Sequence, residues 1–562
     1  MKRYRNLYIL AMALILTAGC QTKQKQMKEE LIAFINHHDS LVIPLSREVN
    51  FAYWNAAISG TEEDFKKAEK LQLQLIEIYA DTVALKQLEK IKISGQVTDT
   101  LLARQLDLLY NQFLMAKADT AKLNAIVRME TEIERKYSIF RTELSGKKMT
   151  DNDVEEILRT SRDVSRQKEV WMAQKKIGRI VADDIKKLVI LRNEVAKEMG
   201  FKNYHSMQLT LSEQDPKVIT ELFDELDTLT KMAFTAVKEE IDTYFVNYYQ
   251  LKSKEELMPW NYQNRFFQEA PKIYDVDLSV YYADKNLESL TASFFYGIGL
   301  PIDGMLKNCD LYEKDGKNQH AFCTNIDRLK DVRVLCNIKP NSYWMNTMLH
   351  EFGHAVFDYN IDNSLPFVLR EPAHTFTTEA IAMVFGRFSS NPQWLRDLVG
   401  IPEEEKIKIA DNCFRTLRLE QLVFSRWAQV MYRFEKSMYA DPEQDLNKLW
   451  WDLVGEYQLL RRPEGRDEPD WATKIHVALF PCYYHNYLLG ELLASQLYYY
   501  IVEHILKSED YKFQSFANNK PIGDYLKTRV FSVGSKYYWN TMIEKATGEK
   551  LTPRYYARQF VE

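Results

Sequence analysis

The sequence predicts a mostly α-helical fold with one small β-sheet. Residues 24–252 repeat apolar side chains every three or four positions among Lys and Glu, which is the pattern of amphipathic helices. Residues 301–339 are instead turn-rich and hold two short runs of β-forming residues, and helical spacing returns from residue 375 to the end. With 46% hydrophobic and 27% charged residues, the 562 residues can bury a large core, and we expect one two-lobed domain.

The first twenty residues have the composition of an export signal. Basic side chains within residues 2–5 precede the apolar run 7–16, and the small residues before Cys20 close it. This end is similar to a lipobox, although Thr17 stands where Leu is usual. We therefore expect cleavage before Cys20 and a lipid on its sulfur atom; an ordinary signal peptide is the alternative.

The expected location of the mature chain, residues 21–562, follows from this signal. It is a cell-envelope lipoprotein that faces the periplasm, and the outer membrane is favoured because residues 21 and 22 are not acidic. No later segment is long and apolar enough to cross a membrane.

Residues 24–252 are predicted to form long helices that make up an N-terminal lobe, and residues 253–562 are expected to form the catalytic part. The helical repeat is clearest in three stretches, which are 61–91, 101–117 and 151–199. Typical helix starts stand at Thr61 and at Thr150 or Asp151, each followed by acidic residues.

A small hairpin is expected before residue 342. Residues 310–317 are rich in turn formers, and 321–324 and 332–338 have the composition of short strands. Extended peptides often bind by adding to a free sheet edge, so the backbone at His320 and Ala321 is a candidate substrate contact. A purely structural hairpin is the alternative.

The most informative motif is the HExxH sequence from His350 to His354. Histidines four residues apart lie on one helix face, so both can bind one metal ion, while Glu351 sits about 100° round the helix and can reach a water molecule there. With ten His in the chain the motif seldom arises by chance, and its apolar flanks predict a buried helix, where unpaired polar groups are costly. We expect one Zn²⁺ per chain, with the two histidines as ligands and Glu351 as general base.

A catalytic zinc ion needs a third protein ligand and one open position. Glu379 is the best candidate, because residues 375–387 have helical spacing and follow a loop rich in Asn, Asp and Pro. Glu371 and His374 are alternatives, but Glu371 precedes Pro372 and is expected in the loop.

A second group of polar residues lies between Lys474 and Tyr487 and includes His476 and Tyr484. Imidazole and phenol groups can donate hydrogen bonds to an oxyanion, and a lysine can bind a carboxylate. Taken alone, such residues are more often part of a core.

Several stretches resemble the angiotensin-converting enzyme family of peptidyl-dipeptidases, which are zinc enzymes of the gluzincin group. They are LHEFGHAVF with TTEAIA, LNKLWWDLVGEY, KIH with the tyrosines that follow it, and VGSKYYWNTMIEKATGEKLTPRYYARQF near the C-terminus. Weaker similarity around residues 53–55 extends the resemblance to nearly the whole chain. The segment DLYEKDGKNQHAFC also resembles the oligopeptidase F and thimet oligopeptidase family.

This resemblance implies a helical ellipsoid of two lobes around a deep groove, with zinc at its floor and N-terminal helices as a lid that admits short peptides. It implies that Glu351 activates water and then protonates the leaving amine. His476 and Tyr487 would stabilise the oxyanion, and Lys474 and Tyr484 would bind the C-terminal carboxylate of the peptide.

The chain departs from the family pattern at three places. The interval from His476 to Tyr487 is one residue longer, so Tyr483 or Tyr484 could supply the catalytic phenol. Met383 stands where the family commonly has an acidic residue, and Asp358 is expected to orient a ligand instead. No arginine follows the Trp450–Trp451 pair by one turn, so we predict weak or absent chloride activation.

Together these features predict a zinc peptidase that acts on short oligopeptides and releases C-terminal dipeptides. An endo-oligopeptidase of the oligopeptidase F type and a catalytically inactive peptide-binding lipoprotein are the alternatives. The formal charge of −5, with both signs mixed, argues against nucleic acid as a partner. We expect a monomer that touches a membrane only through its lipid.

Six cysteines occur in the chain, and lipidation of Cys20 leaves an odd number. At least one thiol should therefore stay unpaired, and we expect most of the remaining cysteines to be buried as small apolar residues.

Overall fold

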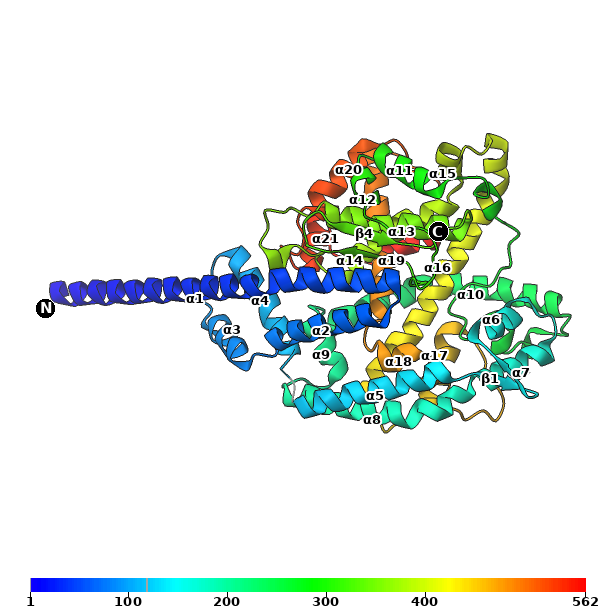
Figure 1. The fold of residues 1–562 in the computed structure, drawn as a ribbon, viewed down its shortest axis with the longest axis horizontal. Coiled ribbons are helices and arrows are strands. Elements are labelled where there is room, and N and C mark those ends of the chain that lie inside the picture. The colour runs from blue at the N-terminus through cyan, green and yellow to red at the C-terminus, as the bar shows by residue number, and fades with distance from the viewer. Residues whose placement is uncertain (1, 118–119, 562) are drawn as a thin grey trace.

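The computed structural model describes residues 2–117 and 120–561, and within them the side chains of residues 23–117 and 121–561. Helices dominate the described chain, and its only sheets are two antiparallel pairs of short strands. This confirms the mostly helical fold. Figure 1 shows helices gathered above and below, with α16 (Glu403–Ala440) crossing diagonally between the two groups.

The helices before residue 342 are α1 (Lys2–Ser59), α2 (Glu62–Tyr79), α3 (Thr82–Ser94), α4 (Thr100–Met115), α5 (Thr120–Ile139), α6 (Asp151–Thr160), α7 (Val164–Gln174), α8 (Lys176–Glu198), α9 (Tyr204–Leu211), α10 (Pro216–Tyr249), α11 (Leu287–Gly297) and α12 (Asp303–Leu306). Those that follow are α13 (Ser342–Tyr359), α14 (Thr375–Arg387), α15 (Pro392–Trp394), α16, α17 (Leu446–Gln458), α18 (Ile475–Leu479), α19 (His485–Tyr500), α20 (Lys520–Tyr525), α21 (Trp539–Thr547) and α22 (Arg554–Phe560).

The predicted helix starts are confirmed. Thr61 caps α2 by accepting a hydrogen bond from the backbone of Asp64, and Thr150 forms a reciprocal capping box with Asp153 at the start of α6. The stretch 61–91 is nevertheless divided, because the Asp81 side chain accepts hydrogen bonds from two backbone N–H groups and begins α3.

Two short hairpins interrupt the helices. Strands β3 (Phe322–Asn325) and β4 (Val332–Leu335) pair antiparallel and form the hairpin predicted before residue 342. The pair β1 (Thr142–Leu144) and β2 (Lys147–Met149) is a second hairpin, which corrects the expectation of only one small sheet. Its turn places Ser145 and Gly146 at φ values of 53° and 76°.

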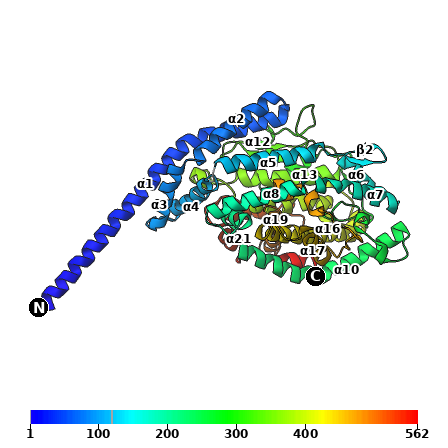
Figure 2. The ribbon, with the colours of Figure 1, turned by 90° about the horizontal axis from the view of Figure 1, so that it is seen from below.

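Helix α1 is packed along α2 over its C-terminal part, and its N-terminal part projects away from the body of the protein (Figures 1 and 2). Helices α1, α3 and α4 share a small core of their own that reaches the body at Val368. No described helix is long and apolar enough to cross a membrane. The side chain of Cys20 lies outside the described side chains, so its lipidation stays a prediction.

The principal hydrophobic core extends from Ile126 to Phe560 and therefore includes helices on both sides of residue 252. Within it, α14 packs between α13 and α19. Gly353 allows the closest approach, because a Cβ atom there would lie 2.7 Å from the Cα atom of Ala382. At the interface between α14 and α19, the Met383 sulfur would lie 3.1 Å from a Cβ atom placed on Gly490.

The cysteines that are described, which are Cys309, Cys323, Cys336, Cys413 and Cys482, are all free thiols, and the last three are buried. The expected unpaired thiols are thus confirmed in this part of the chain.

Candidate metal centre

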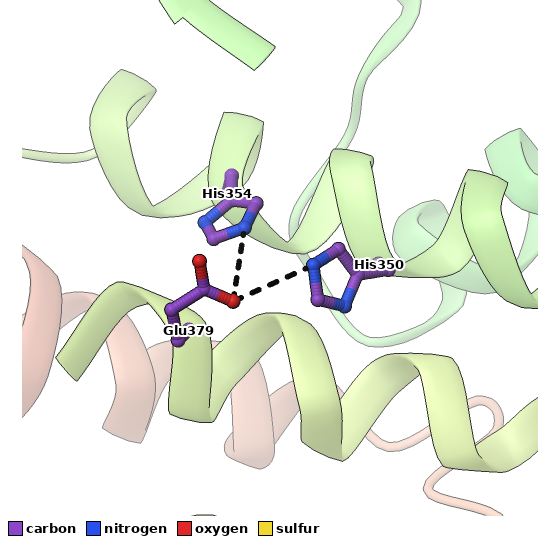
Figure 3. A group of neighbouring side chains, drawn as sticks. All are labelled: His350, His354 and Glu379. Carbon is purple, nitrogen blue, oxygen red and sulfur yellow. Dashed lines mark ion pairs between the residues drawn. The ribbon is translucent and has the colours of Figure 1, made fainter. Parts of the chain in front are cut away.

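Helices α13 and α14 bring His350, His354 and Glu379 together (Figure 3). A carboxylate oxygen of Glu379 lies 3.6 Å from Nε2 of His350 and 3.8 Å from Nε2 of His354. One ligand atom from each residue lies within 4.8 Å of the others, and within the described chain no other group of three or more His, Cys, Asp or Glu side chains converges in this way. Two nitrogens and one oxygen at this spacing suit a tetrahedral metal ion with one open position.

The two histidines are neutral at neutral pH, as metal ligands must be. Burial lowers the pKa of His350 to about 4, and burial together with His350 lowers the pKa of His354 to about 3. His354 Nδ1 lies 2.8 Å from the Thr378 hydroxyl, and this hydrogen bond leaves Nε2 directed at Glu379. The residue that orients His354 is therefore Thr378, which corrects the expectation that Asp358 has this role.

These ligands lie in a cavity of about 440 Å³, here called the metal cavity. Four carboxyl groups line it, and they belong to Glu351, Asp358, Glu371 and Glu379. Burial, followed by the charge of Glu491, raises the pKa of Glu379 to about 7, and burial, followed by Glu371, raises that of Asp358 to about 8. A bound cation would relieve the cost of ionising these buried acids.

The two alternative third ligands are engaged elsewhere. The carboxylate of Glu371 pairs with Arg328 at 2.6 Å. His374 caps α14, where its ring nitrogen accepts a hydrogen bond from the backbone of Phe376 at 3.2 Å. The geometry therefore favours Glu379.

Glu351 is buried beside the ligands and is held by the hairpin. Its carboxylate accepts a hydrogen bond from the backbone of Cys323 in β3, and burial, together with the nearby charge of Glu379, raises its pKa to about 8 in the metal-free protein. A carboxyl group that gains and loses a proton near neutral pH is suited to acid–base work.

The hairpin edge lines the same cavity. Ala321, Phe322 and Cys323 border it, and β4 pairs with only one edge of β3. The backbone N–H of His320 is already bonded to the Asn318 side chain, and the His320 side chain is exposed. The structure thus places Ala321, but not the His320 side chain, at the metal cavity.

Lys474, His476 and Tyr484 form a second cluster outside the residues that line the metal cavity. The Lys474 ammonium group is buried, donates to Gln268 at 2.5 Å and lies 5.5 Å from the centre of the Tyr484 ring. The Tyr484 and His476 rings are in edge contact, with centres 5.2 Å apart. Burial, and then the charge of Lys474, lowers the pKa of His476 to about 4, so its imidazole is neutral and can donate one hydrogen bond.

Tyr487 contacts this cluster through Tyr484. Its ring centre lies 5.4 Å from those of both Tyr483 and Tyr484. Burial and then the charge of Glu379 raise the pKa of Tyr483 and of Tyr487. Burial also raises the pKa of Tyr484, but Glu379 does not contribute to that shift. Of the three tyrosines, Tyr483 and Tyr487 are therefore the two whose ionisation the Glu379 charge opposes.

A further cavity of about 470 Å³ adjoins the metal cavity and shares Glu371, Pro372 and Thr375 with it. It is also lined by His38 and Tyr79 of the helices that cover it, and by Tyr483. The two adjoining cavities, here called the groove, together offer room for an extended ligand beside the metal ligands.

The sequence interpretation missed Thr378, Gln268 and Arg328. Thr378 immediately precedes the Glu379 ligand, so its position on the predicted helix was a usable signal. Nothing near Gln268 indicated a partner for Lys474, because 206 residues separate the two.

Comparison with known proteins agrees with this geometry. The family model for angiotensin-converting enzyme, peptidase family M2, matches residues 25–259 and 281–554. The chain belongs to this family. The match covers the helices that form the groove as well as the metal centre, so the family resemblance extends over most of the chain.

Curated relatives of this family member are distant. A thermostable carboxypeptidase 1 of Pyrococcus furiosus is 25% identical over 42% of this chain and 51% of the relative. Carboxypeptidase 1 of Bacillus subtilis is 23% identical over 43% of this chain and 53% of the relative. An inactive angiotensin-converting enzyme-related protein of Caenorhabditis elegans is 22% identical over 58% of this chain and 40% of the relative. The chain thus spans about half the length of the relatives it matches.

Proposed function

We propose that this chain is a zinc peptidase that releases dipeptides from the C-termini of short peptides. The observation that carries the proposal is the combination of the three converging ligands with a buried lysine that lacks an acidic partner. No described side chain forms an ion pair with Lys474, which is only 7% exposed. A buried ammonium group is costly unless an anion pairs with it, and the C-terminal carboxylate of a peptide supplies that anion.

The donor set fits zinc. It consists of two neutral imidazoles and one carboxylate, and the hydrogen bond between Thr378 and Nδ1 holds the His354 ring with Nε2 toward Glu379. When bound, the ion supplies a Lewis acid that polarises the peptide carbonyl and increases the acidity of water.

The chain's own residues then divide the remaining work. Glu351 takes a proton from the attacking water and returns it to the leaving amine, which its raised pKa allows. Neutral His476 and a tyrosine hydroxyl donate hydrogen bonds to the carbonyl oxygen as its negative charge develops. The tyrosine is Tyr487 in this proposal, with Tyr483 as the alternative.

The peptide is held at both sides of the bond to be cleaved. Lys474, with Tyr484 beside it, binds the terminal carboxylate, while the backbone around Ala321 adds to the hairpin edge. These contacts orient the substrate and raise the effective concentration of the reacting groups.

Two other cleavage modes compete with dipeptide release. The names of two relatives indicate removal of C-terminal residues by carboxypeptidases. Internal cleavage is the second mode, because the groove continues beyond the metal cavity. A peptide-binding protein without turnover is the third alternative, but such a protein has no need of Glu351.

The test is product mapping by mass spectrometry on one short peptide, prepared with a free and with an amidated C-terminus. We expect dipeptides from the free acid only, loss of cleavage with a chelator and recovery with added zinc. Release of single residues would favour carboxypeptidase action, and internal cuts in both peptides an endo-oligopeptidase. Zinc binding without cleavage would overturn the proposal.

We also propose that the chain is a lipoprotein of the cell envelope, anchored through Cys20. The support is the basic, apolar and small-residue order of the first twenty residues. Metabolic labelling with a radioactive fatty acid should mark the wild type and not Cys20→Ala. Equal labelling of both, or of neither, would contradict lipidation at this position.

A further inference from the structure

Asp470 is a buried carboxylate with its own set of donors. Its side chain is 1% exposed, and it begins the short helical segment η7 (Asp470–Thr473). Arg466 donates two hydrogen bonds to it, at 2.5 and 2.6 Å, and the Trp451 indole N–H donates a third at 3.1 Å. A buried carboxylate that accepts three hydrogen bonds is fixed in position.

The segment that Asp470 begins leads directly into Lys474. The Thr473 hydroxyl donates to the Asp470 carbonyl at 2.7 Å and accepts from the Lys175 ammonium group at 3.1 Å. Tyr137 donates to the carbonyl of Ala472 at 2.5 Å. The backbone immediately before Lys474 is thus held by the half-buried Tyr137 of α5 and, through Thr473, by the buried Lys175 at the end of α7.

Asp470 also balances a positive cluster. The ammonium group of buried Lys175 lies 3.6 Å from the centre of the Phe266 ring, and that of Lys474 lies 5.3 Å from the centre of the same ring. Arg265, which pairs with Glu155, and Arg466 add positive charge. Burial lowers the pKa of Lys175 to about 7, and Asp470 is the anion that opposes this lowering most. Without this carboxylate, Arg466 would lose its partner and the cations would repel one another.

We propose that Asp470 is a built-in anion that positions Lys474 for the substrate carboxylate and so removes the need for a free anion at this place. Asp470 is a positioning residue, since it acts through the segment that carries Lys474. Trp451 belongs to the Trp450–Trp451 pair, which no arginine follows by one turn, and its indole N–H already donates to the Asp470 carboxylate. The inference rests on the proposed role of Lys474 in carboxylate binding.

The test compares the wild type with Asp470→Ala, which removes the carboxylate and leaves space beside Arg466. Calorimetry should show that the variant binds a dipeptide with a free C-terminus about tenfold more weakly, as expected for the loss of a charge-assisted contact network. Excess formate, a small carboxylate that fits the vacated space, should restore most of this affinity. Formate and chloride should have little effect on the wild type.

Three controls separate positioning from general destabilisation. Acetohydroxamate, which needs the metal but not Lys474, should bind both proteins equally. Asp242→Ala removes the partner of buried Lys238 in α10, outside the candidate site, and should leave dipeptide affinity unchanged and show no formate response. If Asp470→Ala does not fold, Asp470→Asn keeps the shape, and a smaller loss of affinity with free-acid peptides is expected.

The outcomes are distinct. Wild type that does not bind the dipeptide would overturn the carboxylate role of Lys474, and this inference with it. If the wild type binds the dipeptide but Asp470→Ala binds it equally well, the inference alone is overturned and the proposed function stands. The same holds if formate does not restore the affinity of Asp470→Ala. Chloride or formate activation of the wild type would also contradict a built-in anion.

Discussion

Glu351 differs from its neighbours in the metal cavity because it is held by backbone rather than by another charged side chain. The Cys323 N–H bonds to it, whereas Glu371 pairs with Arg328 and Glu379 faces the two histidines. We predict that Glu351→Gln lowers turnover by about 10²–10⁴-fold while metal content stays the same, because the amide keeps the size but cannot accept the proton. Peptide turnover and metal content by mass spectrometry measure the two effects.

Glu371→Gln is the matched control for that change. It removes a carboxylate from the same cavity but from a residue with no proposed part in proton transfer, so turnover should fall much less. If Glu351→Gln and Glu371→Gln behave alike, or if Glu351→Gln keeps full activity, Glu351 is not the base.

The choice among three tyrosines is a second question at this scale. Of the three, only Tyr483 and Tyr487 have a pKa that is raised, after burial, by the charge of Glu379, whereas Tyr484 contacts Lys474. We predict that Tyr487→Phe lowers kcat about a hundredfold with a small change in KM, the usual effect of losing one oxyanion donor. Tyr484→Phe should instead raise KM for free-acid peptides, and Tyr483→Phe should change neither greatly. A large kcat loss in Tyr483→Phe would exchange the two roles.

Spacing along one helix was enough to predict His350, His354 and Glu351, because an interval of four residues fixes the helix face. Glu379 required a second helix, and Glu371 remained a competitor until the structure showed its pair with Arg328. Thr378 depends on how α14 is rotated against α13. That rotation is decided by side-chain packing between two helices, which no local pattern contains.

At the scale of elements, the closeness of α13 and α14 holds the ligands together. A Cβ atom at Gly353 would meet the backbone of Ala382 at 2.7 Å and cannot be accommodated without moving the helices apart. We predict that Gly353→Ala destabilises the protein by about 1–3 kcal/mol, as overpacking does, and weakens zinc binding. Denaturant unfolding and competition with a chelator measure the two quantities.

Gly386→Ala is the control, since it places a methyl group in α14 with its nearest atoms at 3.4–3.6 Å, an ordinary contact distance. Its stability should be equal or slightly higher, because alanine favours helix by up to about 1 kcal/mol. Zinc affinity that is unchanged in Gly353→Ala would show that the helix spacing does not set the site.

Elements with strong local signals were predictable. Helix α14 has the bounds predicted from its apolar spacing, Thr375–Arg387, and the β3–β4 hairpin lies where β-forming residues alternate with turns. The β1–β2 hairpin was not predicted, because its strands are only three residues long and are rich in Lys and Glu. Its stability depends on packing against α7, which is a tertiary effect.

At the scale of the molecule, the division of the chain at residue 252 stays a prediction, and the hydrophobic cores divide elsewhere. A small core holds α1, α3 and α4, and most buried apolar residues from Ile126 onward belong to the principal core. Two further small clusters are centred on Trp54 and on Ala196. Amphipathic helices show which face is buried but not which partner buries it. The sequence pattern was therefore sufficient for helix content and insufficient for the boundary between lid and body.

The whole-molecule response to pH follows from the groups in the metal cavity. In the metal-free protein the pKa values of Glu351, Asp358 and Glu379 are raised to about 8, 8 and 7. Unfolded carboxyl groups titrate at about 4, so the folded state holds more protons between about pH 4 and 8, and these groups make stability fall as pH rises through that window.

The histidines have the opposite sign. The pKa values of His350 and His354, lowered to about 4 and 3, mean that the unfolded state binds more protons below about pH 6.5, so these groups make stability fall as pH drops. Above about pH 6.5 the histidines are neutral in both states. Only the three carboxyl groups then still titrate, and the metal-free site becomes less stable with rising pH.

A zinc ion favours ionised carboxylates, so it should offset the destabilisation by the buried carboxyl groups more strongly as pH rises. We predict that the Tm difference between zinc-loaded and chelator-treated protein increases between about pH 5.5 and pH 8, because Glu379, with its pKa raised to about 7, loses its proton across this range while both histidines are already neutral. Differential scanning calorimetry at fixed ionic strength measures it, and contributions from groups outside the cavity cancel in the difference. A Tm difference that is constant or decreases toward pH 8 would contradict metal binding by these residues.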